Sequence, residues 1–243
     1  MDERRPFFEH LRELRERLIR SLVAIGIAFV ITYAFKEELF SFLMQPFLKV
    51  MPKGSSFIFT SVTEAFLTYF KVALVSALFL ASPVILYEIW MFVSPGLYER
   101  ERRFLYPFIV FGTISFVAGA LFCYFVAMPS VFRFFMSFAA PFIVPMPALR
   151  PYVNLVLKMV LIFGIVFELP LACFYLSRAG IIDFRMLSKK RGHAVVSIFI
   201  LSALLTPPDV VSQILLALPM WGLFELGILI AKRFGKKEER DGL

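Results

Sequence analysis

The sequence predicts an all-α, polytopic integral membrane protein with six transmembrane helices, both termini cytoplasmic, and short fifth and sixth helices. Its 243 residues are 60% hydrophobic and 18% charged, against averages of about 45–50% apolar and about 25% charged. The apolar residues form runs of the length that crosses a bilayer, about 20 helical residues for about 30 Å of hydrocarbon. The basic residues between these runs are concentrated in alternate loops. We expect a single membrane domain, 1–243.

The first twenty residues are polar but carry a helical pattern. An apolar residue recurs every three or four positions from Phe7 to Leu18, which predicts an amphipathic helix over residues 6–19. We expect this helix to lie at the membrane surface or to lead into the first span, 21–35.

The next segments alternate between spans and loops. The first outer loop contains an apolar helical piece, 39–50, which Pro46 is expected to interrupt. The second span, 65–93, is long, so it is expected to tilt or to kink at Pro83. A short charged loop then leads to the third span, 104–127.

A second outer loop, 128–151, is rich in proline and contains a short predicted helix near 132–138. The fourth span, 152–176, carries Glu168 followed by Pro170. A basic loop separates this span from the last two apolar runs.

The fifth and sixth spans are predicted at 194–205 and 210–231. Twelve helical residues rise only about 18 Å, which is less than the hydrocarbon thickness. In the sixth run, Pro219 and Glu225 shorten the part that suits lipid. A hairpin of two short helices is expected to thin the bilayer locally, unless the other helices shield it.

The distribution of basic residues predicts the orientation. Nineteen of the 26 Lys and Arg residues fall in the N-terminal segment, the loops 94–103 and 177–193, and the C-terminal tail. Five fall in the outer loops and two lie within spans near their outer ends. Because cytoplasmic loops carry an excess of Lys and Arg, this pattern places both termini inside. It also accounts for the net charge of +8 without nucleic acid.

Sequence patterns of catalysis are missing. Gly-rich phosphate loops, His-Glu-x-x-His and Gly-x-Ser-x-Gly do not occur. Cys123 and Cys173 lie in apolar runs and are expected to be buried thiols, and the two histidines have no metal-ligand spacing. No cofactor, metal or enzyme activity is predicted. A small-solute or ion secondary transporter remains an alternative, although we find no internal repeat of the kind such proteins show.

One carboxylate is predicted to lie deep in the membrane. Glu168 falls about two-thirds along the fourth span, where a charge costs at least about 2.5 kcal/mol. It should face a polar recess or a partner, or stay protonated; a satisfied structural carboxylate is the alternative. Glu88 and Glu225 lie nearer to span ends and are expected to be interfacial.

Five strings, in order along the chain, together resemble the TatC family, the polytopic subunit of the twin-arginine protein translocase. They are His10-Leu11-Arg12-Glu13-Leu14-Arg15; Ser82-Pro83-Val84-Ile85-Leu86-Tyr87; Pro95-Gly96-Leu97-Tyr98 with Glu101-Arg102-Arg103; Phe167-Glu168-Leu169-Pro170; and Leu204-Leu205-Thr206-Pro207-Pro208-Asp209 with Ser212-Gln213. One such string would be weak evidence, but five at their expected places in a six-span topology are specific. Without this resemblance, the charge runs 9–20 and 97–103 are typical of solvated faces.

The resemblance implies a receptor for signal peptides that carry two adjacent arginines, with transport of folded proteins driven by the proton-motive force across the cell inner membrane. By motif match, Glu13 and Glu101 would receive the twin arginines, with Arg15 beside them. Glu168 would be the polar group of a concave membrane face, and Pro46 would belong to an implicated outer loop. Residues of the outer turn and fifth helix would dock a partner helix: Leu204, Thr206, Pro207, Pro208, Asp209 and Gln213. The implied partners are TatA- and TatB-like single-span proteins, and self-association in a larger complex is expected.

Overall fold

In the computed structural model, the chain is described over residues 4–51, 56–58, 61–93, 105–138, 146–178, 180–206 and 209–235. Most of these residues are helical. The elements are α1 (Arg4–Ala34), α2 (Lys36–Leu48), α3 (Glu64–Val93), α4 (Leu105–Phe122), the π-helical turn η3 (Cys123–Ala127), α5 (Met128–Met136), α6 (Leu149–Phe167), α7 (Leu169–Arg178), α8 (Phe184–Lys189), α9 (Arg191–Leu205) and α10 (Val210–Phe234).

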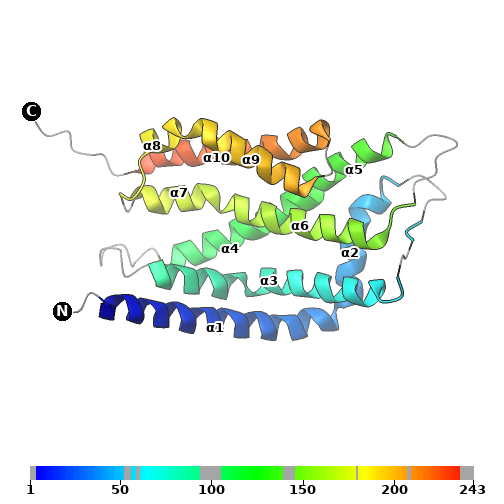
Figure 1. The fold of residues 1–243 in the computed structure, drawn as a ribbon, viewed down its shortest axis with the longest axis horizontal. Helices are drawn as coiled ribbons and strands as arrows, with labels where there is room; N and C mark the ends of the chain where they lie inside the picture. Colours follow the sequence, from blue (N-terminus) through cyan, green and yellow to red (C-terminus); the bar gives the residue numbers. More distant parts are fainter. Residues whose placement is uncertain are drawn as a thin grey trace, which may run out of the picture.

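The long helices lie side by side and run back and forth between two ends of the molecule (Figure 1). The start of α1, α8 and the end of α10 lie together at one end, which we call the terminal end. The helix α2 lies across the bundle at the other end, which we call the α2 end. An even number of passes is the simplest path that returns the chain to the end where it began.

Five apolar stretches among the described residues are long enough to cross a membrane, by length and composition. They are Glu9–Ala34, Glu64–Phe92, Tyr106–Met136, Leu149–Arg178 and Val210–Phe234. The fifth pass in chain order, α9, is apolar but has only 15 residues. The predicted all-helical, multi-span fold is therefore confirmed. Of the last two passes, only α9 is short.

The sixth helix is longer than predicted. It covers 25 residues and continues through Pro219. The expectation that both of the last helices are short is wrong for α10, because one missing backbone donor does not end a helix whose neighbours can satisfy the freed carbonyl groups.

The predicted interruption at Pro46 is also absent, since α2 continues through this residue. The helix α3 continues through Pro83, and the tilt or kink expected there stays a prediction. Burial explains the first case, since Pro46 packs with Leu43, Met44 and Phe47 inside the molecule, and packing outweighs the lost hydrogen bond. The amphipathic N-terminal segment leads directly into the first span, and the short helix expected near 132–138 is the end of the third pass.

The α2 end is held by a cluster of aromatic rings. Phe47 lies 4.9 Å from Phe132 and 4.9 Å from Tyr152, centroid to centroid. The Tyr152 hydroxyl donates to the Leu43 carbonyl over 3.2 Å. Such tilted ring pairs add to the apolar burial, so α2, α5 and α6 form a rigid cap over this end.

Small residues allow the helices to pack closely. Ala28 of α1 packs in one buried cluster with Ala77 and Ala81 of α3, and the Thr32 hydroxyl donates to the Ala73 carbonyl over 2.8 Å. Close contact through small residues and interhelical hydrogen bonds are the usual sources of helix association in membranes. The helices α1 and α3 are therefore packed closely against each other, and this pair positions the polar site described next.

Candidate functional site

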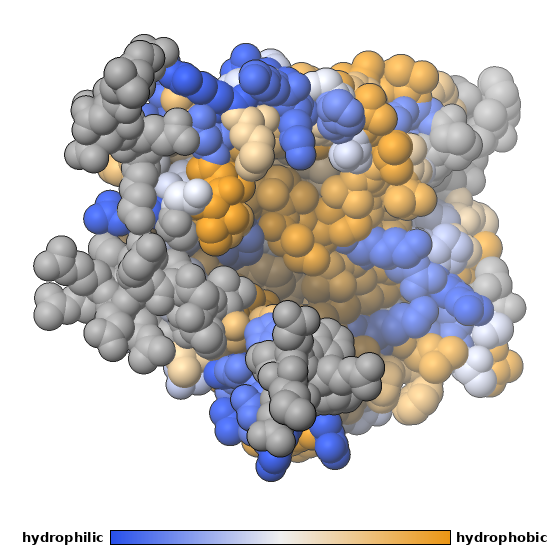
Figure 2. Space-filling view, turned by 60° about the vertical axis from the view of Figure 1, so that its left-hand side comes forward, coloured by the Kyte–Doolittle hydropathy of each residue, from blue (hydrophilic) through white to orange (hydrophobic). Residues whose placement is uncertain are grey.

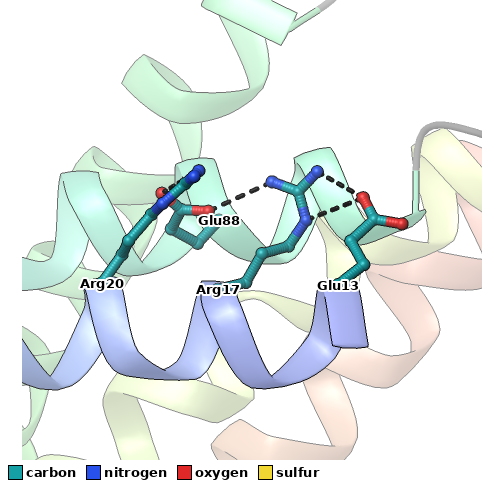
Figure 3. A network of polar contacts seen from close by, with 4 residues as sticks. All are labelled: Glu13, Arg17, Arg20 and Glu88. Carbon is teal, nitrogen blue, oxygen red and sulfur yellow. Dashed lines mark hydrogen bonds and ion pairs between the residues drawn. The ribbon is translucent and has the colours of Figure 1, made fainter. Parts of the chain in front are cut away.

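A network of four charged side chains joins α1 to α3 at the terminal end of the molecule (Figure 3). Glu13, Arg17 and Arg20 come from α1, and Glu88 comes from α3. The spacings of four and three residues along α1 place its three members on one face of the helix. Arg17 lies between the two carboxylates (Figure 3).

The Arg17 guanidinium contacts both carboxylates at once. Its Nε donates to Oε1 of Glu13 over 3.0 Å, and its Nη2 donates to the same oxygen over 2.5 Å. Its Nη1 donates to Oε2 of Glu88 over 3.1 Å. Arg20 completes the network with Nη1 at 3.9 Å from Oε1 of Glu88.

The network becomes more buried toward α3. The side chain of Glu88 is 7% exposed and that of Arg17 is 13% exposed, whereas Glu13 is 33% exposed. Two carboxylates and two guanidiniums balance in charge. Because Glu88 is buried, removal of its partners would leave an uncompensated charge, which is costly. Glu13 is the acidic member that a ligand can reach from the surface.

Ring contacts hold this end of the bundle in place. The His10 ring stacks on Phe92 with centroids 4.4 Å apart, which ties α1 to the last turn of α3. Trp90 stacks with Phe108 at 4.5 Å and meets Tyr175 edge-on at 5.0 Å. The carboxylates therefore sit on helices whose mutual positions are fixed by packing.

The structure places only part of the predicted arginine-binding group. Glu13 lies in the network, and Arg15 is exposed two residues further along α1. Glu101 lies outside the described residues. Sequence reasoning missed Arg17, although its spacing from Glu13 was visible, and it treated Glu88 as interfacial. The Arg17–Glu88 contact joins residues 71 positions apart, so no local pattern could have shown it.

Glu168 lies at the junction between α6 and α7. Its Oε1 is buried and has no hydrogen-bond partner among the described residues. Gly112 makes room for it, since a Cβ on that glycine would lie 3.4 Å from Oε2 of Glu168 and 3.0 Å from Leu86. The junction itself follows from Pro170, which lacks the backbone donor that would continue a regular helix. The carboxylate is therefore set among helices α4, α6 and α7.

Two shallow apolar grooves lie along α9. One, of about 220 Å³, is bordered by α6, α7, α9 and α10, and the other, of about 210 Å³, by α9 and α10. Their lining includes Val166, Leu169, Ile198, Met220 and Trp221. Figure 2, which is turned toward the terminal end, shows an apolar hollow at mid-height with hydrophilic side chains above and below it. This face of the molecule is therefore not flat.

The predicted partner-docking residues divide into exposed and structural ones. Leu204 is 71% exposed, whereas Thr206 is buried and bonds back to Ser202. Asp209 begins α10, where its Oδ1 accepts the Ser212 backbone N–H over 2.7 Å. Gln213 donates to the Phe199 carbonyl over 2.9 Å and so ties α10 to α9. Pro207 and Pro208 lie outside the described residues.

The partly exposed Glu225 and the two buried cysteines have structural surroundings. Glu225 pairs with Arg191 over 2.7 Å and links α10 to α9. Both cysteines are buried free thiols. In the part of the chain that the structure describes, no three His, Cys, Asp or Glu side chains gather to hold a metal ion.

Comparison with known proteins identifies the family. Residues 9–219 match the family model of the Sec-independent protein translocase protein TatC. The TatC protein of Desulforapulum autotrophicum is 46% identical over 240 residues, covering 99% of this chain and 89% of the relative. That of Escherichia coli K12 is 36% identical over 242 residues, covering 99% and 94%.

Solved structures agree with the sequence comparison. A crystal structure described as twin arginine translocase receptor TatC in DDM superposes with a TM-score of 0.85 at 36% identity, covering 92% of this chain and 99% of that one. These matches support a protein translocase component over an enzyme or a small-solute transporter. The chain is a multi-pass membrane protein and belongs to the TatC family of Sec-independent protein translocase proteins.

Proposed function

We propose that this chain is the signal-peptide receptor and core subunit of a twin-arginine protein translocase. It binds signal peptides with two adjacent arginines and, with partner subunits, moves folded proteins across the membrane with the proton-motive force. The observation that carries the proposal is Glu13, a partly exposed carboxylate on a fixed helix that already holds an arginine side chain. The solved relatives' description as twin arginine translocase receptors agrees with it.

The chemistry of the site suits arginine. A guanidinium presents its donors in a planar fork that matches a carboxylate, whereas lysine offers a single charged point. The contact between Glu13 and Arg17 shows that a guanidinium fits beside this carboxylate. We propose that Glu13 and Glu101 each receive one arginine of the peptide, with Arg15 at the edge of the same site.

The orientation belongs to the same proposal. The helix α1 begins and α10 ends at the terminal end of the molecule (Figure 1), where the basic residues of α8 also lie. The excess of Lys and Arg on one side favours a cytoplasmic location for that end. We place the protein in the cell inner membrane, with both termini and Glu13 facing the unexported cargo.

The partners are proposed to dock along the last two helices. Single-span TatA- and TatB-like proteins need an apolar surface with a few polar groups. The grooves beside α9, with the exposed Leu204 and with Gln213 near them, offer such a surface. Glu168 and Pro46 are assigned supporting roles in the membrane face and the outer cap. Self-association in a larger complex is part of the proposal.

The short α9 supports a role in membrane deformation. Its 15 residues rise about 22 Å, less than the hydrocarbon thickness of about 30 Å. A short span is accommodated by a thinner bilayer around it. We propose that this thinning lowers the barrier to the passage of folded cargo.

The test is crosslinking of a twin-arginine signal peptide to the purified full-length protein. Wild-type protein should capture this peptide and should capture a twin-lysine version at least about tenfold less, because lysine makes fewer directed bonds. Glu13→Ala and Glu101→Ala should each lower capture, and Glu16→Ala serves as the control, since Glu16 is more exposed than Glu13 and pairs with Arg12 rather than with Arg17. Equal capture of both peptides, unaffected by Glu13→Ala and Glu101→Ala, would overturn the proposal.

A further inference from the structure

The carboxylate assigned to a signal-peptide arginine already has one of its two oxygens engaged. Arg17 directs Nε and Nη2 to a single oxygen of Glu13, at 3.0 and 2.5 Å. An incoming guanidinium that seeks the full face of this carboxylate meets another guanidinium of the same chemistry. Binding at Glu13 is therefore an exchange of partners rather than the filling of an empty site.

Arg17 has a second carboxylate within reach. Its third nitrogen, Nη1, contacts Oε2 of Glu88 over 3.1 Å (Figure 3). Arg17 can give up Glu13 and keep its bond to Glu88, so the exchange leaves neither charge unpaired. This matters because Arg17 and Glu88 are the two most buried members of the network, and a buried charge without a partner costs several kcal/mol.

The opposite role, a strut that holds Glu13 ready for the peptide, fits the geometry less well. A residue with that role would hold Glu13 through contacts that leave the two-oxygen face of the carboxylate free for the ligand. Here two donors of Arg17 take one oxygen of Glu13, which removes the paired geometry that a peptide arginine would use. The charge balance agrees, because the resting network is already neutral and has no excess negative charge to attract a cation.

We propose that Arg17 is a resident competitor for the signal-peptide arginine, and that Glu88 is the carboxylate that holds Arg17 while the peptide occupies Glu13. This inference rests on the proposed function. The competitor lowers the affinity for every cationic ligand by the same factor, since each must displace the same contact. It therefore sets a threshold for binding, while the guanidinium fork sets the preference for arginine over lysine.

The test measures the affinity of a fluorescently labelled twin-arginine signal peptide, and of its twin-lysine version, for the full-length protein in lipid nanodiscs. Arg17→Gln should tighten binding of both peptides by the same factor, on the order of tenfold for a lost charge-assisted pair, with their ratio unchanged. Arg17→Lys should fall between Arg17→Gln and wild type, because lysine retains charge without the fork.

A matched control is available on the same helix. Arg12 forms an i, i+4 pair with Glu16 over 3.4 Å, and its side chain is 81% exposed. Arg12→Gln removes the same charge without touching Glu13, and it should leave both affinities near those of wild type. Tightening by Arg12→Gln equal to that by Arg17→Gln would mean a general effect of net charge and would overturn the proposal.

Double variants test the coupling. In a Glu13→Gln background, Arg17→Gln should no longer tighten binding. Glu88→Gln should weaken binding severalfold, because the displaced Arg17 loses its charged acceptor, and this effect should vanish when Arg17→Gln is also present. Interaction terms of this kind are what a double-mutant cycle isolates.

The outcomes separate this inference from the proposed function. Weaker binding by Arg17→Gln in a protein that unfolds at the wild-type temperature would make Arg17 a positioning residue and refute the competitor role, while the receptor function would stand. Equal affinity of wild-type protein for the twin-arginine and twin-lysine peptides would refute the receptor function itself. If Arg17→Gln fails to fold, the peptide affinities of the Glu88→Gln and Arg17→Lys variants are compared with those of the wild-type protein instead.

Discussion

At Glu168, one carboxylate oxygen is buried without a hydrogen-bond partner among the described residues. A buried polar atom without a hydrogen-bond partner destabilises the folded state. A functional role for Glu168 would explain its presence at this position. Gly112 lies beside the other oxygen, where an added Cβ would be 3.4 Å from Oε2, so the close approach of α4 to this carboxylate depends on a glycine. Glu168 thus differs from Glu64, which is fully used within the fold: it accepts the backbone N–H groups of Ser61 and Arg150.

Substitution of Glu168 separates hydrogen bonding from mere packing. Glu168→Gln keeps the hydrogen-bonding shape and should retain transport within about a factor of three, whereas Glu168→Leu removes the polar group and should reduce it at least about tenfold. Loss of a membrane carboxylate relieves an insertion cost of at least about 2.5 kcal/mol, so unfolding is not the expected cause. The measurement is uptake of a twin-arginine substrate by membrane vesicles. Normal uptake with Glu168→Leu would remove the functional role.

Residue-level prediction from sequence depends on chemistry that is local or that matches a motif. Glu13 was selected by its motif, and its spacing from Arg17 follows from helix geometry. Glu88 shows where such reasoning ends, because its ion pairs depend on how α1 packs against α3. In the sequence, an acidic residue near the end of an apolar run has the same signature whether its side chain is solvated or paired with two arginines.

At the scale of elements, close helix contacts depend on a few glycines. Gly119 of α4 lies against α6, where an added Cβ would be 2.4 Å from the Phe163 carbonyl oxygen and 2.9 Å from the Cα of Gly164. These are backbone atoms and cannot rotate away. The hydropathy of the third span predicted a helix there, but the sequence contains no sign that this glycine, rather than Gly26, faces a neighbour.

Gly119→Ala should therefore separate α4 from α6 and destabilise the fold by about 1–3 kcal/mol. Gly26→Ala is the matched control, since nothing lies within 4 Å of its added Cβ, and alanine favours a helix by about 1 kcal/mol. A thiol-reactive dye can follow thermal unfolding in detergent, because Cys123 is fully buried when folded. An equal unfolding temperature for both variants would contradict the close packing.

Prolines were the least predictable elements. Pro46 and Pro219 each lie inside a continuous helix, although the sequence suggested an interruption at the first and a shortened membrane helix at the second. In water a freed carbonyl group would favour the end of the helix. Within a bundle of apolar helices, packing and neighbouring donors keep the chain helical, and those neighbours are known only from the fold.

At the scale of the whole molecule, hydropathy predicted the helical, multi-span architecture because the length of a span follows from the thickness of the bilayer. The spans must satisfy their own backbone groups, and basic loops favour one side. Six passes return the chain to the terminal end, but the fifth pass rests on α9, which falls below the usual length for a crossing. The orientation and this crossing can be tested together.

Single cysteines report which end of each helix faces outward. Val62, beside the start of α3, is fully exposed, and Val210, at the start of α10, is 68% exposed; both lie at the end opposite Lys190, which precedes α9. An impermeant thiol reagent added to intact spheroplasts should label Val62→Cys and Val210→Cys. It should label Lys190→Cys only after the membrane is opened.

The native background for this labelling is low, since Cys123 and Cys173 are buried. Because α9 alone connects Lys190 to the turn before Val210, opposite labelling of these two sites requires its 15 residues to carry the chain across. Labelling of both from the same side would mean that α9 lies within one leaflet and that the protein has five spans. Reversed labelling at all three sites would place the carboxylates of α1 and α3 away from the cytoplasm, where no unexported signal peptide could reach them.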